Sequence, residues 1–285
     1  MANIRRSMLF IPGNNSGMLI SSDVFDADSI IFDLEDSVAL DEKDSARILV
    51  KEVLKTIHFK SEIIVRVNPF DTPYYALDVE EIKQSNIDLI LLPKATVESV
   101  IDLSKRLEGT EIGIMVLIET AMGVEQVYNI LDASNRCYGL MLGGEDLCVD
   151  LNCKRTKLGQ ELFYARGRVV NAAHALNKFV IDTPFTDIYD ESGLEKDTLF
   201  AKSLGFDGKA SINPRQIVSI NQVFNPTIDE INHAKRIIEA KDRALKEGKG
   251  VFSLDGKMVD LPIIKRAEKI IEMASKIGLI KGVLL

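Results

Sequence analysis

Eight short apolar segments recur along the chain as far as residue 213, and segments with helical spacing lie between them. We expect strands at 7–12, 29–34, 62–68, 87–93, 111–119, 137–144, 178–184 and 206–213. Successive strands start roughly 20–40 residues apart, which is the length of one strand–helix repeat. Their apolar residues are continuous rather than alternating, as in a parallel sheet that is covered on both faces. The pattern therefore predicts an α/β fold.

The segments between the strands carry apolar residues at spacings of three and four, which is typical of amphipathic helices. We expect helices at 41–55, 96–108, 123–134 and 161–176. Eight such repeats fit a closed (β/α)8 TIM barrel better than an open doubly wound sheet. No G-x-G-x-x-G follows the first strand and no G-x-x-x-x-G-K-[ST] occurs. The dinucleotide-binding and P-loop interpretations therefore lose their main support.

The pattern after Pro214 is helical. Long helices are expected near 227–247 and 260–277, and the polar, Gly-rich segment 248–260 between them reads as a loop or a short hairpin. We therefore expect a barrel domain over residues 1–225, which would carry the catalytic site, and a C-terminal helical extension over residues 226–285.

The composition is that of an ordinary globular protein, with 46% hydrophobic and 27% charged residues. A net charge of −8 without a basic cluster argues against nucleic-acid and membrane-surface partners. Cys137, Cys148 and Cys153 lack C-x-x-C spacing and indicate reduced thiols. The apolar stretch at the N-terminus is too short for a signal peptide, and no run approaches the roughly 18 residues of a membrane span. These features predict a cytoplasmic protein.

The active site of a (β/α)8 barrel lies at the C-terminal ends of its strands. Charged and polar residues stand at or just after the expected strand ends: Asp33, Glu35, Asp36, Arg66, Asn68, Lys94, Glu119, Glu145, Asp146, Asp182 and Asn213. We therefore expect several carboxylates and two cations to converge on one rim of the barrel.

Glu119 and Asp146 each end a strongly apolar strand, where an unpaired carboxylate would be costly to bury. Two carboxylates together with several water molecules suit Mg²⁺, which prefers hard oxygen ligands and keeps part of its hydration. Alternatively, each acid caps the helix that follows it. The spacing alone leaves both interpretations open.

Arg66 stands two residues before the end of the third expected strand, in IIVRVN. It either forms a buried ion pair with an acid of the neighbouring strand or binds a substrate carboxylate with its planar fork. Strand alternation would place Asp33 and Glu35 on one face and Asp36 on the other, if the second strand persists that far. We expect Glu35 and Asp36 to orient metal-bound water or Arg66.

Other candidates are weaker. Lys94 could form a Schiff base, but a structural or substrate-charge role suits its position after Pro93 at least as well. Arg166 and Arg168 are expected on the exposed side of a helix. The three histidines, His58, His174 and His233, have neither metal-ligand nor triad spacing.

Several runs, in order from residue 5 to 260, resemble one family. They are RRSMLFIPGNN, FDLEDSVALDEKDSAR, IIVRVN, LPK, IET, GGEDL, SLGFDGKASINPRQI and DGKMVD. Together they look like the HpcH/HpaI aldolase superfamily, which includes citrate lyase beta subunits and acyl-CoA lyases. The resemblance implies a Mg²⁺-dependent (β/α)8 barrel that cleaves 3-hydroxyacyl thioesters by a retro-aldol step. For a citrate lyase beta subunit, the products of a citryl thioester would be oxaloacetate and an acetyl thioester.

The resemblance also implies roles for single residues. Glu119 of IET and Asp146 of GGED would bind Mg²⁺, and Arg66 of RVN, together with Glu119, would contact the substrate. Asp260 of GKMVD would act at a neighbouring subunit's active site, in a homo-oligomer (trimer or hexamer) against which the C-terminal extension packs. The thioester carrier would be CoA or a separate acyl-carrier protein, in the latter case beside citrate lyase alpha and gamma subunits.

Two alternatives stay open. EDLCVDLNCKRT, around residues 145–155, resembles stand-alone malyl-, citramalyl- or related 3-hydroxyacyl-CoA lyases as much as carrier-dependent members. In an alternative of another class, the chain is a non-catalytic assembly subunit of a lyase complex.

Overall fold

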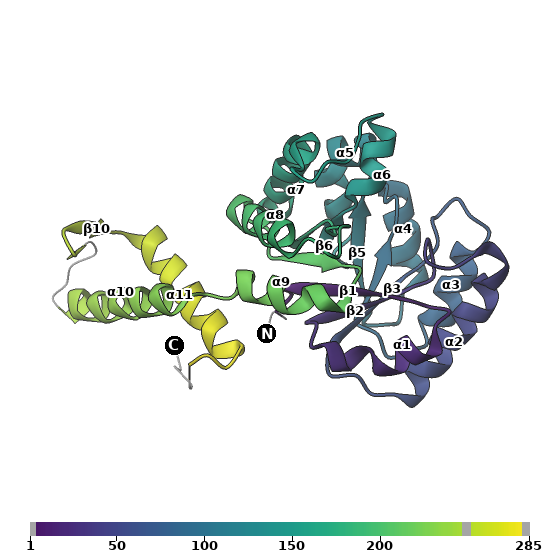
Figure 1. The fold of residues 1–285 in the computed structure, drawn as a ribbon, viewed down its shortest axis with the longest axis horizontal. Helices are drawn as coiled ribbons and strands as arrows, with labels where there is room; N and C mark the ends of the chain where they lie inside the picture. Colours follow the sequence, from purple (N-terminus) through teal and green to yellow (C-terminus); the bar gives the residue numbers. More distant parts are fainter. Residues whose placement is uncertain (1–3, 247–251, 281–285) are drawn as a thin grey trace. The chain divides into compact units, whose positions relative to one another are not determined.

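A computed structural model describes residues 4–246 and 252–280 of the chain. Eight parallel strands form a closed barrel in the order of the sequence (Figure 1). They are β1 (Ser7–Pro12), β2 (Ser29–Asp33), β3 (Glu62–Arg66), β4 (Leu89–Leu92), β5 (Gly113–Ile118), β6 (Cys137–Leu142), β7 (Phe179–Asp182) and β8 (Gly208–Ser211). The predicted (β/α)8 TIM barrel is therefore confirmed, and every strand falls inside an expected segment.

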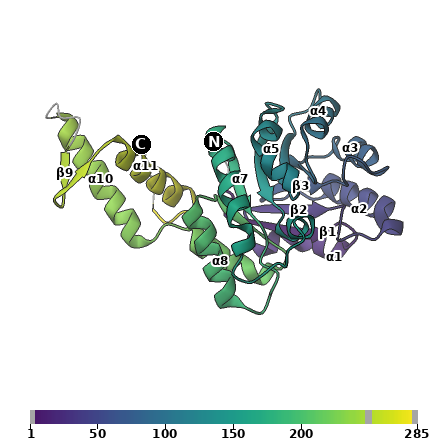
Figure 2. The same cartoon turned by 90° about the horizontal axis from the view of Figure 1, so that it is seen from above.

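Helices surround the strands (Figure 2). They are α1 (Ser16–Ser21), α2 (Lys43–Thr56), α3 (Tyr75–Ile82), α4 (Val97–Arg106), α5 (Ala121–Asp132), α6 (Gly144–Asp150), α7 (Phe163–Ala175), α8 (Glu191–Leu204) and α9 (Ile217–Phe224). Short 3₁₀ helices are η1 (Ser22–Phe25), η2 (Leu40–Glu42), η3 (Gln160–Leu162) and η4 (Pro214–Gln216). The helices α2, α4, α5 and α7 lie within three residues of the expected bounds.

Two layers of apolar side chains explain why the strands read as continuous hydrophobic runs. Inside the barrel, buried side chains pack together from every strand: Met8, Ile31, Ile64, Leu89, Leu91, Met115, Leu117, Met141, Ile181 and Ala210. On β5 the alternate residues Ile114, Val116 and Ile118 belong to the cluster between the strands and the helices. Both faces of each strand are therefore covered, as parallel sheets require.

The strand register fixes which side chains meet at the C-terminal rim. The barrel closes where Met8 of β1 pairs with Ser29 of β2 on one side and with Ala210 of β8 on the other. Asp33, the last residue of β2, pairs with Arg66, the last residue of β3. Because all strands are parallel, their C-terminal ends share one rim, and the residues that follow them are brought together there.

The chain divides into two compact units between Phe224 and Asn225. The second unit contains the long helices α10 (Ile228–Lys246) and α11 (Leu261–Lys276) and the antiparallel strands β9 (Phe252–Leu254) and β10 (Lys257–Val259). The two helices bury a cluster of small and branched side chains: Ile231, Ala234, Ile237, Val259, Ile264, Ala267, Ile271 and Ala274. A short hairpin therefore occupies part of the expected segment, whose residues 248–251 lie outside the described ranges. The catalytic role of the barrel and the packing of the extension against a neighbouring subunit remain predictions.

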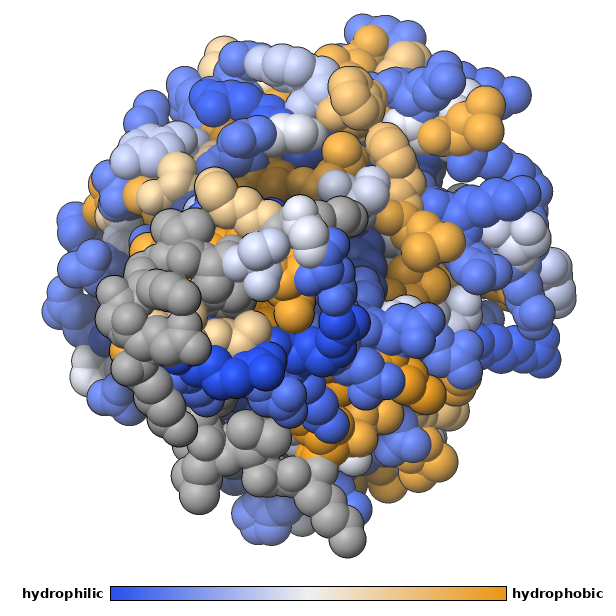
Figure 3. Space-filling view, turned by 90° about the vertical axis from the view of Figure 1, so that its left-hand side faces the viewer, coloured by the Kyte–Doolittle hydropathy of each residue, from blue (hydrophilic) through white to orange (hydrophobic). Residues whose placement is uncertain are grey.

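The surface mixes polar and apolar side chains, as the hydropathy-coloured view shows for one face (Figure 3). In the ranges that the structure describes, no helix is both long enough and apolar enough to cross a membrane.

Candidate active site

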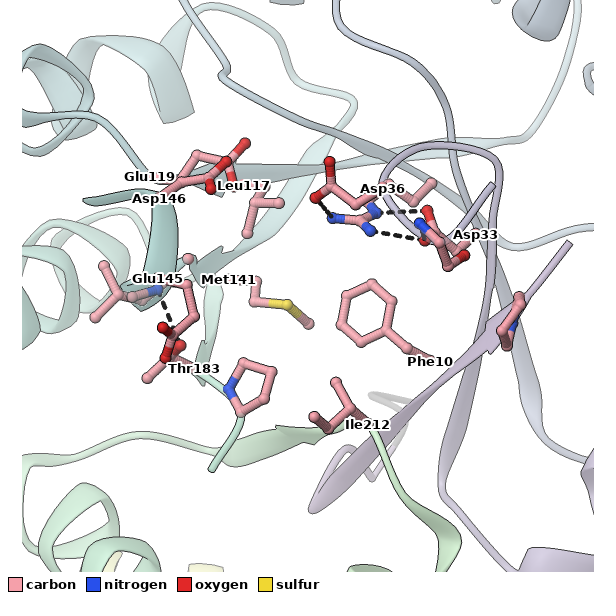
Figure 4. Close-up of a pocket in the computed structure, with 17 residues that line it drawn as sticks. Phe10, Asp33, Asp36, Leu117, Glu119, Met141, Glu145, Asp146, Thr183 and Ile212 are labelled. Carbon is pink, nitrogen blue, oxygen red and sulfur yellow. Dashed lines mark hydrogen bonds and ion pairs between the residues drawn. The ribbon is translucent and has the colours of Figure 1, made fainter. Parts of the chain in front are cut away.

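A cavity of about 430 Å³ opens at the C-terminal rim of the barrel. Its walls come from the ends of every strand except β4 and from the loops that follow: Phe10, Pro12, Asp33, Asp36, Ser37, Arg66, Leu117, Glu119, Met141, Leu142, Gly143, Gly144, Glu145, Asp146, Thr183, Pro184 and Ile212. Glu119 and Asp146 lie together on one side of this cavity, with Asp33 and Asp36 on the other and Met141 and Phe10 between them (Figure 4). The barrel thus brings five of the expected acids to a single cavity: Asp33, Asp36, Glu119, Glu145 and Asp146.

Glu119 directly follows β5, and the residue is only 4% exposed. Its Oε1 accepts a hydrogen bond from the backbone N–H of Lys94 at 2.8 Å. Burial raises the pKa of Glu119 to about 7, and the nearby charge of Asp146 adds to this, while the Lys94 N–H and the charge of Arg66 oppose it. A buried carboxyl with this pKa is half protonated near neutrality unless a cation lies beside it.

Lys94 reaches Glu119 through its backbone. Its φ of 46° lies in the left-handed region, which a residue with a side chain rarely adopts. This turn directs its N–H toward Glu119, while its own side chain is exposed. Lys94 is not among the residues that line the cavity. Its observed contact is therefore structural, and the contact gives no support to a Schiff-base role.

Gly143 and Gly144 allow the loop after β6 to approach Glu119 closely. A Cβ on Gly143 would lie 2.6 Å from Cβ of Glu119 and 2.7 Å from its Oε2. Gly144 starts the short helix α6, and Asp146 lies in its first turn. Any side chain at position 143 would push this loop, and Asp146 with it, away from Glu119.

Helix capping does not explain the position of Glu119, and it explains that of Asp146 only in part. Thr120, not Glu119, caps α5, because its hydroxyl accepts the N–H of Gly123 at 3.0 Å. The capping interpretation is therefore wrong for Glu119. Asp146 lies in the first turn of α6, where the helix dipole favours a negative charge.

The donor set of Glu119 and Asp146 fits Mg²⁺. In residues 4–246 and 252–280, no group of three or more His, Cys, Asp or Glu side chains is placed to hold a metal. The protein would therefore supply two carboxylates and water the remaining ligands, which Mg²⁺ tolerates better than most ions do. A cation between the two carboxylates would also relieve the repulsion that raises the pKa of Glu119.

Arg66 is buried and bonded to acids. Its Nε and Nη2 donate to the two carboxylate oxygens of Asp33 at 2.6 and 2.7 Å. The predicted ion pair with an acid of the neighbouring strand is therefore confirmed. Because Asp33 occupies this edge of the guanidinium, a substrate carboxylate would have to approach from another side. Arg66 also lies over the ring of Phe10, with 5.0 Å between its Cζ and the ring centroid.

Glu35 and Asp36, the two acids that follow Asp33 in the sequence, also contact Arg66. Its Nη1 lies 2.9 Å from Oε2 of Glu35 and 3.3 Å from Oδ2 of Asp36. Both are thus placed to orient Arg66, as expected for that part of their predicted role. The strand ends at Asp33, however, so Asp33 and Glu35 do not alternate along a strand. Asp33 instead accepts the N–H groups of Glu35 and Ser37 at 2.9 and 3.0 Å, which folds the run around Arg66.

Asp33 and Glu35 both lie beside Arg66, but their pKa values are shifted in opposite directions. Burial acts to raise the pKa of Asp33, but the charge of Arg66 and the hydrogen bonds from Arg66, Ser37 and Glu35 hold it below its usual value. Burial raises the pKa of Glu35 to about 8, against the charge of Arg66 and with the support of Glu119, Asp36 and Asp33. Asp33 is therefore the anionic partner of Arg66, whereas the raised pKa of Glu35 favours its protonated form.

Two sequence-based expectations are wrong. Arg166, expected on an exposed helix face, is completely buried, and Asp182, expected at the rim, is also completely buried. They bond to each other, through Nε at 2.9 Å and Nη2 at 2.8 Å, and to Asp197 and Lys209. Arg168 is only partly exposed and donates to the backbone oxygen of Glu125 at 3.1 Å. The sequence contained one indication of this buried ion network. Lys209 lies in a barrel strand, and a lysine there needs a buried acid as its partner.

Other expected site residues have local structural contacts. Asn68 donates to Oδ2 of Asp78 at 2.6 Å, and Asn213 caps η4. Asp260 belongs to the second unit and caps α11, accepting the N–H of Ile263 at 3.3 Å. Its action at a neighbouring subunit's site remains a prediction. Thr183 and Phe10 also line the cavity, but they carry no charge, so the pattern of charged residues at strand ends does not mark them.

The barrel, its rim cavity and its paired carboxylates are those of an α/β barrel enzyme, and the sequence specifies which kind. Residues 6–214 match the sequence model of the family "HpcH/HpaI aldolase/citrate lyase". The chain therefore belongs to the HpcH/HpaI aldolase/citrate lyase family.

Similar proteins carry related names. The chain is 43% identical to "Citrate lyase subunit beta" from Leuconostoc mesenteroides subsp. cremoris, over 95% of this chain and 94% of the relative. It is 35% identical to a "(3S)-malyl-CoA thioesterase" from Cereibacter sphaeroides, over 96% of this chain and 95% of the relative. A crystal structure of the protein CitE from Mycobacterium tuberculosis, in complex with magnesium, acetoacetate and coenzyme A, matches with a TM-score of 0.79 and 28% identity. The match covers 95% of this chain and 98% of that one.

Proposed function

We propose that this chain is a Mg²⁺-dependent carbon–carbon lyase that cleaves a citryl thioester into oxaloacetate and an acetyl thioester. The observation that carries the proposal is the pair of carboxylates, Glu119 and Asp146, at the rim cavity. Its citryl specificity rests on the 43% identity to a relative named citrate lyase subunit beta. Magnesium in the CitE complex supports the choice of metal.

Glu119 and Asp146 would hold the metal ion at one side of the cavity. When bound there, Mg²⁺ supplies a Lewis acid for the oxygen atoms of a hydroxy-carboxylate. The residues of the chain position the rest of the substrate. The apolar side chains of Phe10, Leu117 and Met141 exclude water from the reacting bond.

Arg66 supplies positive charge on the opposite side of the cavity. Breaking the carbon–carbon bond turns the hydroxyl group into the ketone of the keto acid, which releases the hydroxyl proton, and leaves an electron pair on the thioester fragment, as an enolate that takes up one proton. A fixed cation stabilises such developing charge at little reorganisation cost. Asp33, Glu35 and Asp36 hold Arg66 in place. We propose Asp260 of a neighbouring subunit as the proton donor.

The carrier of the thioester would be CoA or a separate acyl-carrier protein. The relative is named as a subunit, which supports partners of the citrate lyase alpha and gamma type for this chain. The coenzyme A in the CitE complex supports a free CoA thioester instead. A homo-oligomer, trimeric or hexameric, would bring Asp260 of one copy to the cavity of the next.

A second candidate is a stand-alone malyl- or related 3-hydroxyacyl-CoA lyase. The 35% identity to a protein named (3S)-malyl-CoA thioesterase favours it. A non-catalytic assembly subunit is less well supported, because such a barrel has little need for Glu119, Asp146 and Arg66 around one cavity.

The test uses the purified full chain with Mg²⁺. Citryl-CoA, a citryl-loaded acyl-carrier protein and malyl-CoA are supplied separately, and the keto acid released is measured. We expect oxaloacetate from a citryl substrate, at a rate that EDTA abolishes. Glyoxylate from malyl-CoA alone would support the second candidate. No keto acid from any substrate, with alpha and gamma subunits added, would contradict both lyase readings.

A further inference from the structure

We propose that Thr183 is a positioning residue for the metal site, connecting the loop that carries Asp146 to a buried ion network behind the cavity. The inference rests on the proposed role of Glu119 and Asp146 as metal ligands. Thr183 lines the cavity directly after β7 (Figure 4).

The ion network consists of Arg166 on α7, Asp182 on β7, Asp197 on α8 and Lys209 on β8. These four side chains are between 0% and 4% exposed, and none of the four residues lines the cavity. Nζ of Lys209 donates to Oδ2 of Asp182 and Oδ2 of Asp197, both at 2.7 Å. Nη2 of Arg166 donates to Oδ1 of Asp197 at 2.7 Å. Two cations thus balance two anions, and each charge has at least two partners.

The ion network restrains the backbone of Thr183. Nζ of Lys209 makes its third hydrogen bond to the backbone oxygen of Thr183, at 2.8 Å. Asp182, the residue before Thr183, is held by both Arg166 and Lys209. The backbone at Thr183 is therefore restrained on two sides, which leaves its buried side chain little freedom to move.

The side chain of Thr183 acts on α6. Its Oγ1 accepts the backbone N–H of Gly144 at 2.9 Å. This N–H belongs to the first turn of α6 and has no partner within the helix. Gly143 holds the N-cap position and has no side chain that could accept it. Thr183, which is 39 residues away in the sequence, thus takes the role of a helix cap.

Because the loop is closely packed, the hydrogen bond between Gly144 and Thr183 also affects the position of Asp146. Cβ atoms on Gly143 and Gly144 would meet Glu119 and Thr183, respectively, at 2.6 and 2.8 Å. The loop is thus seated between the two side chains, and Asp146 follows two residues later. A shift at Gly144 would change the distance between the carboxylates of Asp146 and Glu119. Outer partners of metal ligands commonly tune affinity in this way.

The experiment compares three variants of the full chain without substrate. Thr183→Val keeps the shape but removes the acceptor, and Thr183→Ser keeps the hydroxyl. Thr198→Val is the matched control, because Thr198 is equally buried but donates its hydroxyl to Leu194 within α8. Binding of Mg²⁺ is measured by calorimetry and of Mn²⁺ by electron paramagnetic resonance, and melting temperatures report folding.

We expect Thr183→Val to raise the dissociation constant of both ions about tenfold, within the range for lost outer partners. Thr183→Ser and Thr198→Val should stay within about twofold of the wild type. If Thr183→Val does not fold, Thr183→Ala, which adds no bulk, takes its place with the same expectation. Wild-type affinity in the folded variant without the hydroxyl overturns the inference and leaves the metal site standing. A wild-type protein that binds neither ion overturns the metal site, and the inference with it.

Discussion

Asp33 and Arg66 end neighbouring strands in register, and both carboxylate oxygens of Asp33 accept hydrogen bonds from Arg66, at 2.6 and 2.7 Å. This pair determines how the cation is presented to the cavity. It occupies the Nε edge of the guanidinium and leaves Nη1 to Glu35 and Asp36. Asp33, Glu35 and Asp36 thus hold Arg66 in place. The proposed metal ligands, Glu119 and Asp146, lie on the other side of the cavity.

Replacing Asp33 by Asn should destabilise the protein. It leaves a buried guanidinium without its main counter-charge, and breaking such pairs costs about 3 kcal/mol or more of unfolding free energy. The control is Asp36→Asn, because the side chain of Asp36 is 65% exposed and its loss should cost under about 1 kcal/mol. Urea unfolding of the two variants measures the difference. Equal stability of the two would show that Asp33 is not the principal partner.

Glu35→Gln should change how stability depends on pH. Burial raises the pKa of Glu35 from 4.5 to about 8, so the folded state keeps a proton that the unfolded state releases. The contribution of this group to stability is therefore present below about pH 4.5 and is lost as the pH rises toward 8. Glutamine cannot titrate, so the stability gap between variant and wild type should shift in favour of the variant over this window. Urea unfolding of the metal-free proteins at several pH values tests this. A gap that does not vary with pH would refute the shift.

Gly143→Ala should damage the metal site and the fold together. Its Cβ would lie 2.6 Å from Cβ of Glu119, and overpacking of this kind costs about 1–3 kcal/mol. The matched control is Gly167→Ala on α7, where an added Cβ meets nothing within 4 Å. That change should be neutral or stabilise by roughly 0.5 kcal/mol. Thermal unfolding and Mg²⁺ binding are measured for both. Two variants with the same behaviour would mean that the loop tolerates a side chain.

Much of the architecture was predictable because apolar periodicity records which faces are buried. The strands followed from continuous runs such as IMVLI, and the rim from the rule that parallel strands end together. Glu119 and Asp146 were singled out because each follows a strongly apolar strand, where an unpaired carboxylate is costly to bury.

The alignment of neighbouring strands and the face that each helix buries could not be predicted from the sequence in the same way. The choice of Asp33 as the partner of Arg66 depends on the alignment of two strands, which the local sequence does not specify. The burial of Arg166 depends on which face α8 covers, because Asp197 comes from that helix. Thr183 has no charge to mark it, and its role follows only from the distance to Gly144.

Loss of either proposed metal ligand should abolish turnover while the fold persists. Glu119→Gln and Asp146→Asn keep the shape of the side chain but remove the charge that a divalent ion needs. A metal worth several kcal/mol in the transition state corresponds to a rate loss of about 100-fold or more. Glu98→Gln, on the exposed surface of α4, serves as the control. Rates with a citryl thioester are compared at saturating Mg²⁺. A ligand variant with more than about a tenth of the wild-type rate would contradict the assignment.

The most direct test of the central claim is a crystal of the protein grown with Mn²⁺ in place of Mg²⁺, in which anomalous scattering locates the ion. The account predicts one strong peak at the rim cavity, bonded to a carboxylate oxygen of Glu119 and one of Asp146, with water completing the shell. A fully occupied ion bonded to neither carboxylate, or a cavity that stays free of metal at saturating Mn²⁺, would contradict it.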